Sequence, residues 1–228
     1  MSNMNLTHLT SLTAHILLGA PGSGKGTQAQ RLVETFSLTH LSTGDILRDA
    51  VSKGTAIGLR AKAIMAEGKL VDDDTVNGLV FARLLDETTD VLFDGYPRTL
   101  QQAQALEDFL SSKGMALGSV VLIDVPQEVL EARVVGRRVC SNNACGAIYH
   151  LTSKPPKQAG VCDLCGSPLK HRSDDTAEAF QSRMGEFNST FQPLLGFYKH
   201  RPNFRSVDGN RPPELVFESL RHVFGDRA

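Results

Sequence analysis

The segment GAPGSGKGTQ at residues 19–28 limits the possible folds of this chain more than any other stretch. It follows the pattern G-x-x-x-x-G-K-[ST], except that Gly26 stands where Ser or Thr is usual and Thr27 comes after it. In such a segment the glycines let several backbone N–H groups turn toward phosphate oxygens, and the helix that follows adds the positive end of its dipole. An apolar run at residues 15–20 precedes the segment and an amphipathic run at residues 27–36 follows it. This context predicts a strand, a phosphate-binding loop and a helix, with a glycine-rich turn that binds nothing as the alternative.

Beyond this unit, apolar runs and amphipathic runs alternate along the chain. Further strands are predicted at residues 38–42, 91–95, 119–125 and 204–209, and further helices at residues 44–54, 57–68, 72–87, 127–139, 176–200 and 212–225. The helix at 176–200 should break near Pro193. Strands that alternate with helices predict an α/β fold, in which helices cover both faces of a parallel sheet. Residues 140–171 are rich in Pro, Gly and Asn and lack this periodicity, so we interpret them as a small inserted module.

The composition argues against several classes of partner. The chain has 228 residues with 24 basic and 25 acidic side chains, so its formal net charge of -1 gives no overall reason to bind nucleic acid or an acidic membrane. It has no apolar run long enough to span a bilayer. Residues 1–14 contain neither Lys nor Arg, which argues against a secretory signal or a transit peptide. We therefore expect a cytoplasmic protein whose residues 1–14 form a disordered extension.

The four cysteines all lie in the inserted module, at Cys140, Cys145, Cys162 and Cys165. The spacing is Cys-x4-Cys, sixteen residues, then Cys-x2-Cys, and a glycine directly follows the second cysteine of each pair, Gly146 and Gly166. Two such pairs predict a tetrahedral four-cysteine site for a structural zinc ion, which would stabilise a module too small to have its own core. Three alternatives stay open: His150 replaces one ligand, iron or cobalt replaces zinc, or the four thiols are free and bind no metal.

Arginines are a second set of candidate phosphate ligands. Six of them follow turns or strands, or lie on predicted helix faces, in distant parts of the chain: Arg48, Arg98, Arg133, Arg137, Arg172 and Arg183. The planar guanidinium matches phosphate oxygens, and phosphoryl transfer depends mainly on positioning and charge neutralisation. Asp94 lies in the predicted strand at 91–95, as a candidate ligand for Mg²⁺-bound water or as a cap of the strand end. An Asn-Lys-x-Asp motif, with which a GTPase would bind guanine, is absent.

Six short motifs occur in the order and spacing typical of adenylate kinases: GAPGSGKGTQ, LSTGDILR, GKLV, DGYPRTLQQ, VGRRV and RSDD. The chain resembles this family over residues 15–225. The resemblance implies the reversible transfer ATP + AMP = 2 ADP, with Mg²⁺ on the ATP, in a P-loop NTPase-like α/β fold. It also implies a core domain at residues 15–41, 72–135 and 174–228, an AMP-binding flap at residues 42–71 and a lid at residues 136–173. Family members usually have a Cys-x2-Cys spacing in the first lid pair, whereas this chain has Cys-x4-Cys.

The resemblance also assigns roles to individual residues. ATP would be bound by Gly22, Ser23, Gly24, Lys25, Gly26, Thr27, Arg133, Arg137, Ile148, Tyr149 and Arg211. AMP would be bound by Thr43, Arg48, Lys69, Leu70, Val71, Gly95, Tyr96, Pro97, Arg98, Gln102, Arg172 and Arg183. Catalysis would depend on Lys25, Asp94, Arg98, Arg137, Arg172 and Arg183, with Asp94 acting through the waters of Mg²⁺.

The remaining expectations concern the hinge, the substrates and the assembly. Asp174 and Asp175 resemble an acidic pair at the lid hinge, and they could also cap the helix that follows. Thr43, Thr99 and Gln102 favour AMP as the acceptor. The family is commonly monomeric, so a monomer is expected. The alternatives are another nucleoside monophosphate kinase, a GTP:AMP phosphotransferase and, outside enzymes, a zinc-finger regulatory protein that binds nucleotide as a signal.

Overall fold

The computed structural model describes residues 12–225, and its centre is a parallel sheet. The sheet has the strand order β2-β3-β1-β4-β8. Its strands are β1 (Thr13–Leu18), β2 (Thr39–Ser42), β3 (Val91–Asp94), β4 (Ala116–Asp124) and β8 (Phe204–Asp208). All neighbouring strands pair in parallel. The predicted α/β fold with a parallel sheet is therefore confirmed.

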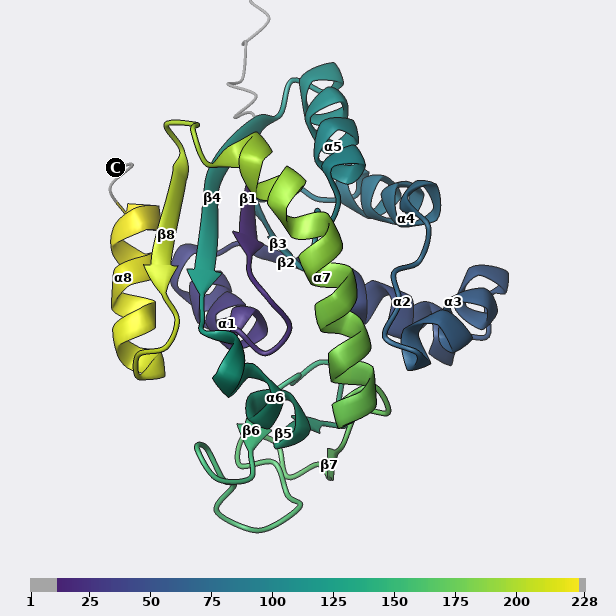
Figure 1. Ribbon diagram of the computed structural model, residues 1–228, viewed down its shortest axis with the longest axis vertical. Coiled ribbons are helices and arrows are strands. Elements are labelled where there is room, and N and C mark those ends of the chain that lie inside the picture. Colours follow the sequence, from purple (N-terminus) through teal and green to yellow (C-terminus); the bar gives the residue numbers. More distant parts are fainter. Residues whose placement is uncertain (1–11, 226–228) are drawn as a thin grey trace, which may run out of the picture.

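Helices pack on both faces of this sheet (Figure 1). They are α1 (Lys25–Phe36), α2 (Thr43–Ser52), α3 (Ala56–Ala66), α4 (Asp73–Leu85), α5 (Leu100–Ser112), α6 (Gln127–Val135), α7 (Ala177–Tyr198) and α8 (Pro213–Gly225). Successive side chains of a strand point to opposite faces. Ile16 of β1 accordingly packs in the core with α4 and α5, whereas Leu17 packs in the core with α1, α6 and α8. No helix within residues 12–225 is long and apolar enough to cross a membrane.

A second, three-stranded sheet lies at one end of the molecule, below the core in Figure 1. Its strands β5 (Arg137–Cys140), β6 (Ile148–His150) and β7 (Leu169–Lys170) pair antiparallel in the order β6-β5-β7. The buried side chains of this part are few, namely Val139, Cys140, Ala147, Tyr149 and Cys162. We call residues 136–173 the lid and residues 42–71, which include α2 and α3, the flap.

Two predicted helices differ from the structure. The helix predicted at 127–139 ends as α6 at Val135, and the following residues form strand β5. The ring of His150 lies against the backbone at Gly136, between α6 and β5. A Cβ on Gly136 would lie 2.2 Å from Nε2 of His150, so only glycine leaves room for the ring. The predicted break at Pro193 is also wrong, because α7 continues through it. Proline removes one helical hydrogen bond, but α7 packs in both cores, on one side of Pro193 through Met184 and on the other through Leu194.

Two smaller features of the structure differ from the prediction. Helix α5 was missed, although Thr99 caps its first turn by accepting a hydrogen bond from the N–H of Gln102. The extension predicted at residues 1–14 ends too late, because β1 begins at Thr13 and pairs there with Ala116 of β4. Residues 1–11 of that predicted extension lie outside the described residues.

Candidate active site

A cleft of about 920 Å³ lies between the loop after β1, the flap and the lid. All residues predicted for ATP, AMP or catalysis line this cleft, with the exception of Tyr96. Tyr96 is fully buried and its hydroxyl donates to Oδ1 of Asn77 at 2.7 Å, so its side chain belongs to the core. Lys69 lines the cleft, but its ammonium forms an exposed ion pair with Glu67 at 2.9 Å. The fold thus collects the predicted residues from distant parts of the chain into one site.

The phosphate loop joins β1 to α1 and depends on glycine for its backbone shape. Gly22 and Gly24 have φ angles of 85° and 96°, which residues with side chains rarely adopt. A Cβ on Gly22 would lie 2.7 Å from the carbonyl oxygen of Leu130, so the loop packs directly on α6. Helix α1 begins at Lys25, immediately after the loop. Its free N-terminal N–H groups and its dipole therefore lie where the loop can bind an anion.

Lys25 is half-buried and its ammonium lies against the loop. Its Nζ donates to the carbonyl oxygens of Gly19 at 2.7 Å and Ala20 at 2.9 Å. Burial lowers the pKa of Lys25 to about 8, and the positive charges of Arg98 and Arg183 act in the same direction. A phosphate group beside Lys25 would oppose this effect, because an opposite charge favours the protonated amine.

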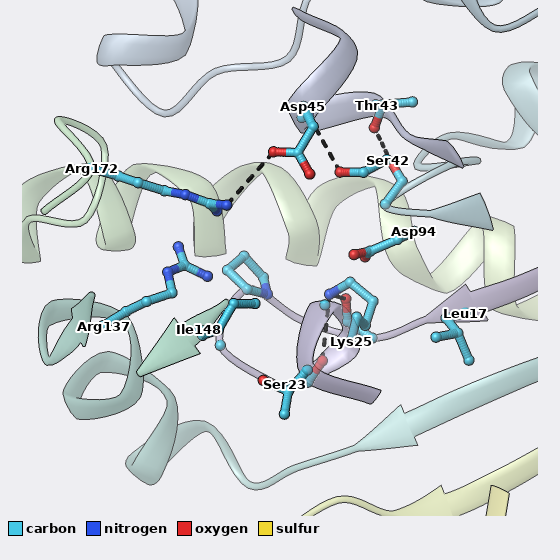
Figure 2. A pocket seen from close by; sticks show the side chains of 18 of the residues that line it. Leu17, Ser23, Lys25, Ser42, Thr43, Asp45, Asp94, Arg137, Ile148 and Arg172 are labelled. Carbon is cyan, nitrogen blue, oxygen red and sulfur yellow. Dashed lines mark hydrogen bonds and ion pairs between the residues drawn. The ribbon is translucent and has the colours of Figure 1, made fainter. Parts of the chain in front are cut away.

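Asp94 ends β3 beside the loop (Figure 2). It forms an ion pair with His40 of β2, in which His40 Nε2 lies 3.4 Å from Asp94 Oδ2. Burial favours the neutral acid, but His40 and Lys25 outweigh it and lower the pKa of Asp94 below its usual value. Asp94 is therefore an anion at neutral pH, as a ligand of Mg²⁺ or of its waters must be.

Arginines from the lid and from α7 line the cleft opposite the loop. Arg137 of β5 donates from Nε to Oδ2 of Asp175 at 2.8 Å, and Arg183 of α7 donates to Oδ2 of Asp174 at 3.3 Å. Asp175 is completely buried. The predicted acidic pair thus orients two of the predicted phosphate ligands. Neither aspartate caps α7 with its side chain, because Thr176 occupies that position.

This arginine cluster carries more positive charge than its partners neutralise. Burial lowers the pKa values of Arg172 and Arg183 to about 10 each, and neighbouring arginines act in the same direction. Twelve Lys and Arg side chains line the cleft against five Asp and Glu side chains, which leaves an excess of positive charge. Such a cluster is suited to binding several phosphate groups.

Asp45 of α2 forms ion pairs with two of these arginines. Its Oδ1 accepts a hydrogen bond from Nη2 of Arg48 at 2.7 Å and lies 3.7 Å from Nη2 of Arg172 (Figure 2). Burial favours the neutral acid, but Arg48 and Arg172 lower the pKa of Asp45 below its usual value. The ion pair with Arg172 connects the flap to the lid across the cleft. Both arginines were predicted to bind the AMP phosphate, so Asp45 lies where it would compete with that phosphate.

Polar contacts tie the flap side of the cleft to β3 and α5. Thr43 Oγ1 donates to the carbonyl oxygen of Gly95 at 2.8 Å. Gln102 is buried, and its Oε1 accepts from the N–H of Arg98 at 2.8 Å while its Nε2 donates to Oδ1 of Asp73 at 2.8 Å. Both ends of the carboxamide are thus bonded within the protein. The predicted contact of Gln102 with the AMP base stays a prediction.

The other end of the cleft is closed by α6, the loop after β8, and the lid. Arg133 of α6 donates from Nη1 to the carbonyl oxygen of Gly209 at 3.2 Å, and Arg211 of the same loop also lines the cleft. On the lid side, a Cβ on Gly26 would lie 3.3 Å from Cδ1 of Ile148. Glycine at this position therefore leaves room for the lid to lie close to the start of α1.

The four cysteines of the lid come together as a cluster. Their Sγ atoms all lie within 4.8 Å of one another. The separations are 3.4 Å for Cys140–Cys165 and 3.7 Å for Cys145–Cys162, near the value of about 3.8 Å that Zn–S bonds of about 2.3 Å give in a tetrahedron. Burial favours the thiol of Cys162, but hydrogen bonds from Tyr149 and from backbone N–H groups lower its pKa to about 6. The thiolate, which is the form that binds metal, is thus favoured at Cys162, whereas burial and the neighbouring thiols raise the pKa of Cys140. The fit of the cluster to a thiophilic ion therefore rests on its geometry.

His150 does not belong to this cluster. Its Nδ1 accepts hydrogen bonds from the N–H groups of Thr152 at 3.1 Å and Ser153 at 3.2 Å. Its Nε2 therefore carries the proton and donates to the carbonyl oxygen of Ala132 at 3.0 Å. Both ring nitrogens are bonded at the junction of lid and core, so this geometry excludes the alternative in which His150 replaces a cysteine.

Three residues of the site were given no role from the sequence: His40, Asp45 and Asp73. Each acts on a residue that was predicted. His40 reaches Asp94 only because β2 pairs with β3 in a register that sets Ser42 opposite Asp94. That register is a property of the sheet, so the sequence carries no local signal for it. The motif STGD does contain Asp45, and a charge beside a predicted phosphate ligand is a signal that could have identified it.

Comparisons with known proteins agree with this site. A family model described as adenylate kinase matches residues 17–203. The adenylate kinase of Clostridium tetani is 44% identical over 212 residues, which cover 92% of this chain and 97% of that protein. The adenylate kinase of Methanosarcina acetivorans is 44% identical over 210 residues, 91% of this chain and 96% of that protein. For the adenylate kinase of a Geobacillus species the identity is 42% over 212 residues, 92% of this chain and 97% of that protein. The chain belongs to the adenylate kinase family.

Proposed function

We propose that this phosphotransferase catalyses the reversible reaction ATP + AMP = 2 ADP. The observation that carries the proposal is the arrangement of cations in one cleft. Lys25 and the loop form an anion site at one side, and the arginine cluster forms a second one opposite. A protein that only binds one nucleotide has no need of the second site. Two nucleotides that exchange a phosphoryl group need both, since charge neutralisation and positioning dominate this chemistry.

Each group of residues has a distinct task in this proposal. The N–H groups of Gly22, Gly24 and Gly26 and the ammonium of Lys25 bind the donor phosphates. Arg48 and Arg98 bind the AMP phosphate. Arg137, Arg172 and Arg183 neutralise the group in transit, and Asp174 and Asp175 orient two of them. The transferred group passes from one phosphate oxygen to another, so no covalent intermediate with the protein is required.

The cleft also has a place for the metal of the ATP complex. Adenylate kinases use Mg²⁺ with ATP, and when bound the ion would neutralise part of the phosphate charge. Asp94 is the residue that would hold its water ligands, because it is ionised, half-buried and adjacent to the loop. His40 keeps Asp94 in that form.

The lid and the flap are proposed to exclude water from the cleft. Arg172 of the lid and Asp45 of the flap already lie 3.7 Å apart across it. Closure would prevent water from accepting the phosphoryl group in place of AMP.

The four-cysteine cluster supports a structural zinc ion in the lid, since four thiolates leave no open position for water. The family resemblance also supports a monomer that acts in the cytoplasm.

The direct test is an assay of ADP formation with ATP or GTP as donor and AMP, CMP, UMP or GMP as acceptor. We expect the highest turnover with ATP and AMP. Higher turnover with UMP than with AMP would contradict the acceptor, and higher turnover with GTP than with ATP would favour a GTP:AMP phosphotransferase.

A pair of arginine variants tests the second phosphate site. Arg98→Ala should lower turnover about 100-fold, the usual effect of removing one group that stabilises developing charge. Arg60→Ala is the matched control, because Arg60 lies exposed on α3 of the flap. Near-normal activity of Arg98→Ala would contradict the proposed clamp.

A further inference from the structure

One face of α1 lies beneath the lid. Gly26 and Gln30 are four residues apart and therefore lie on the same side of the helix. Both face the lid: a Cβ on Gly26 would lie 3.3 Å from Cδ1 of Ile148, and Nε2 of Gln30 donates to the carbonyl oxygen of Gly146 at 2.7 Å. Gln30 also lines the cleft. The helix that carries the phosphate loop is thus hydrogen-bonded to the lid one turn beyond the loop.

The acceptor of this bond belongs to the cysteine cluster. Gly146 directly follows Cys145, has a φ of 58°, and donates its own N–H to the carbonyl oxygen of Asn142 at 3.0 Å. The loop from Cys140 to Cys145 is wider than the spacing usual in the family, and its residue Asn143 also lines the cleft. The position of the Gly146 carbonyl is therefore set by the same short loop that supplies two of the four sulfur atoms.

This bond differs in kind from the other contacts that close the lid. Arg172 and Asp45 form an ion pair at 3.7 Å, but phosphate groups would compete for that arginine when nucleotides bind. Arg137 and Asp175 pair at the hinge itself. The bond from Gln30 joins a neutral amide to a backbone carbonyl and needs no charged partner. It can therefore persist while the arginines bind phosphate.

We propose that Gln30 is a positioning residue that latches the cysteine-bearing loop of the lid onto α1, and so holds the lid over the donor nucleotide. The proposal rests on the proposed function, in which ATP occupies the loop side of the cleft. Loss of the latch shifts the lid toward an open state before any nucleotide binds. Because ATP binds best to the closed lid, its affinity falls by up to the same factor, a limit reached where the open lid predominates.

The test combines Gln30→Met with the matched control Gln104→Met. Methionine keeps the length and helix propensity of glutamine but has no amide to donate. Gln104 is exposed on α5, so the same substitution there removes no lid contact. One neutral hydrogen bond corresponds to about a two- to tenfold change in an equilibrium. We expect Gln30→Met to raise the Kd of ATP, measured by calorimetry without AMP, by up to about that factor, with less than a twofold change in the KM of AMP.

A distance measurement separates a latch from a direct contact between Gln30 and ATP. Fluorescent noncanonical amino acids are placed at exposed Gln158 in the lid and exposed Glu218 on α8, which leaves the cysteines untouched. In nucleotide-free protein with its metal bound, Gln30→Met should shift the distance distribution toward the open lid, and Gln104→Met should not. An unchanged distribution, an unchanged Kd, or an equal rise in the KM of AMP would overturn the proposal.

A shorter variant, Gln30→Asn, tests whether the hydrogen bond to Gly146 is the cause of these effects. Gln30→Asn retains the amide but is too short to reach Gly146, so it should reproduce the effect of Gln30→Met, and wild-type behaviour of Gln30→Asn would contradict the latch. Both readouts, the Kd of ATP and the lid distance, are obtained without turnover. A failure of the proposed reaction would appear in the ADP assay of the wild-type protein, whereas a failure of the latch would appear in the Gln30 variants, in the Kd of ATP, the lid distance or the KM of AMP.

Discussion

The phosphate loop and the lid line the same cleft, but they are held in place in different ways. The loop lies between β1 and α1 and packs against the carbonyl of Leu130, next to one of the two large apolar cores. The lid has only five buried side chains of its own, two of which belong to the cysteine cluster. Apart from its hinge, it reaches the rest of the protein through polar contacts such as Gln30–Gly146 and Arg172–Asp45. A phosphate loop that packs on the core thus faces a lid that is held mainly by polar contacts. This arrangement suits a reaction that must exclude water during transfer and then release its products.

The strongest test of the rigid side is Lys25→Met. The ammonium should be the main cationic contact of the donor phosphates, so its loss should lower kcat by about 100- to 1,000-fold. Its pKa of about 8 shows that burial disfavours the charged form, so the melting temperature should not fall. The ADP assay and thermal denaturation measure the two effects. A loss of activity below tenfold, or a large loss of stability, would mean that Lys25 is structural.

The strongest test of the mobile side is removal of the metal. Cys162→Ser should release the ion and loosen the lid, lowering kcat/KM for ATP by about tenfold or more, since structural metal sites are coupled to folding. The melting temperature should fall by about 5 °C, as expected for a loss of about 2 kcal/mol in a chain of this size. Metal analysis should give about one zinc ion per wild-type chain. Wild-type protein without metal, and with an unchanged melting temperature after chelation, would contradict a structural zinc site.

The loop and the lid also differ in what the sequence reveals about them. Contiguous residues determine the loop, so the pattern from Gly19 to Thr27 and its place between a strand and a helix were readable directly. The cysteine pairs likewise predicted the cluster that the structure shows. Strand β5 was missed because its pairing partners lie much farther along the chain, at residues such as His150 and Lys170. His40 was given no role for the same reason, since its importance arises from strand pairing. Asp45 was overlooked although it lies near Arg48 in the sequence.

The pH dependence of ATP binding tests the protonation of Lys25 in the loop, with a smaller expected effect. In the free protein the pKa of Lys25 is about 8, and bound phosphate raises it, so above pH 8 binding of ATP takes up a proton. The Kd of ATP should therefore rise with increasing pH, by at most about tenfold per unit. Calorimetry from about pH 7 to about pH 9.5 measures this slope on both sides of the pKa. Lys25→Arg is the control, because its guanidinium stays protonated over this range. A wild-type slope equal to that of Lys25→Arg would contradict the assignment.

The smallest expected effect concerns the contact between flap and lid. Asp45→Asn removes the carboxylate that occupies Arg48 and Arg172. Arg48 then binds the AMP phosphate without competition from this carboxylate, so the KM of AMP should fall about two- to threefold, within the range of partly exposed ion pairs. Asp74→Asn on the exposed start of α4 is the matched control. A higher KM of AMP in Asp45→Asn would show that Asp45 assists binding of AMP.

The central claim is that the cleft transfers a phosphoryl group between two nucleotides and keeps water out. Phosphorus NMR of the wild-type protein with Mg²⁺ and ATP, first alone and then with AMP, tests it most directly. ATP alone should be stable, and added AMP should convert both nucleotides into ADP without release of inorganic phosphate. Release of inorganic phosphate from ATP alone, at a rate comparable to ADP formation with AMP present, would contradict it.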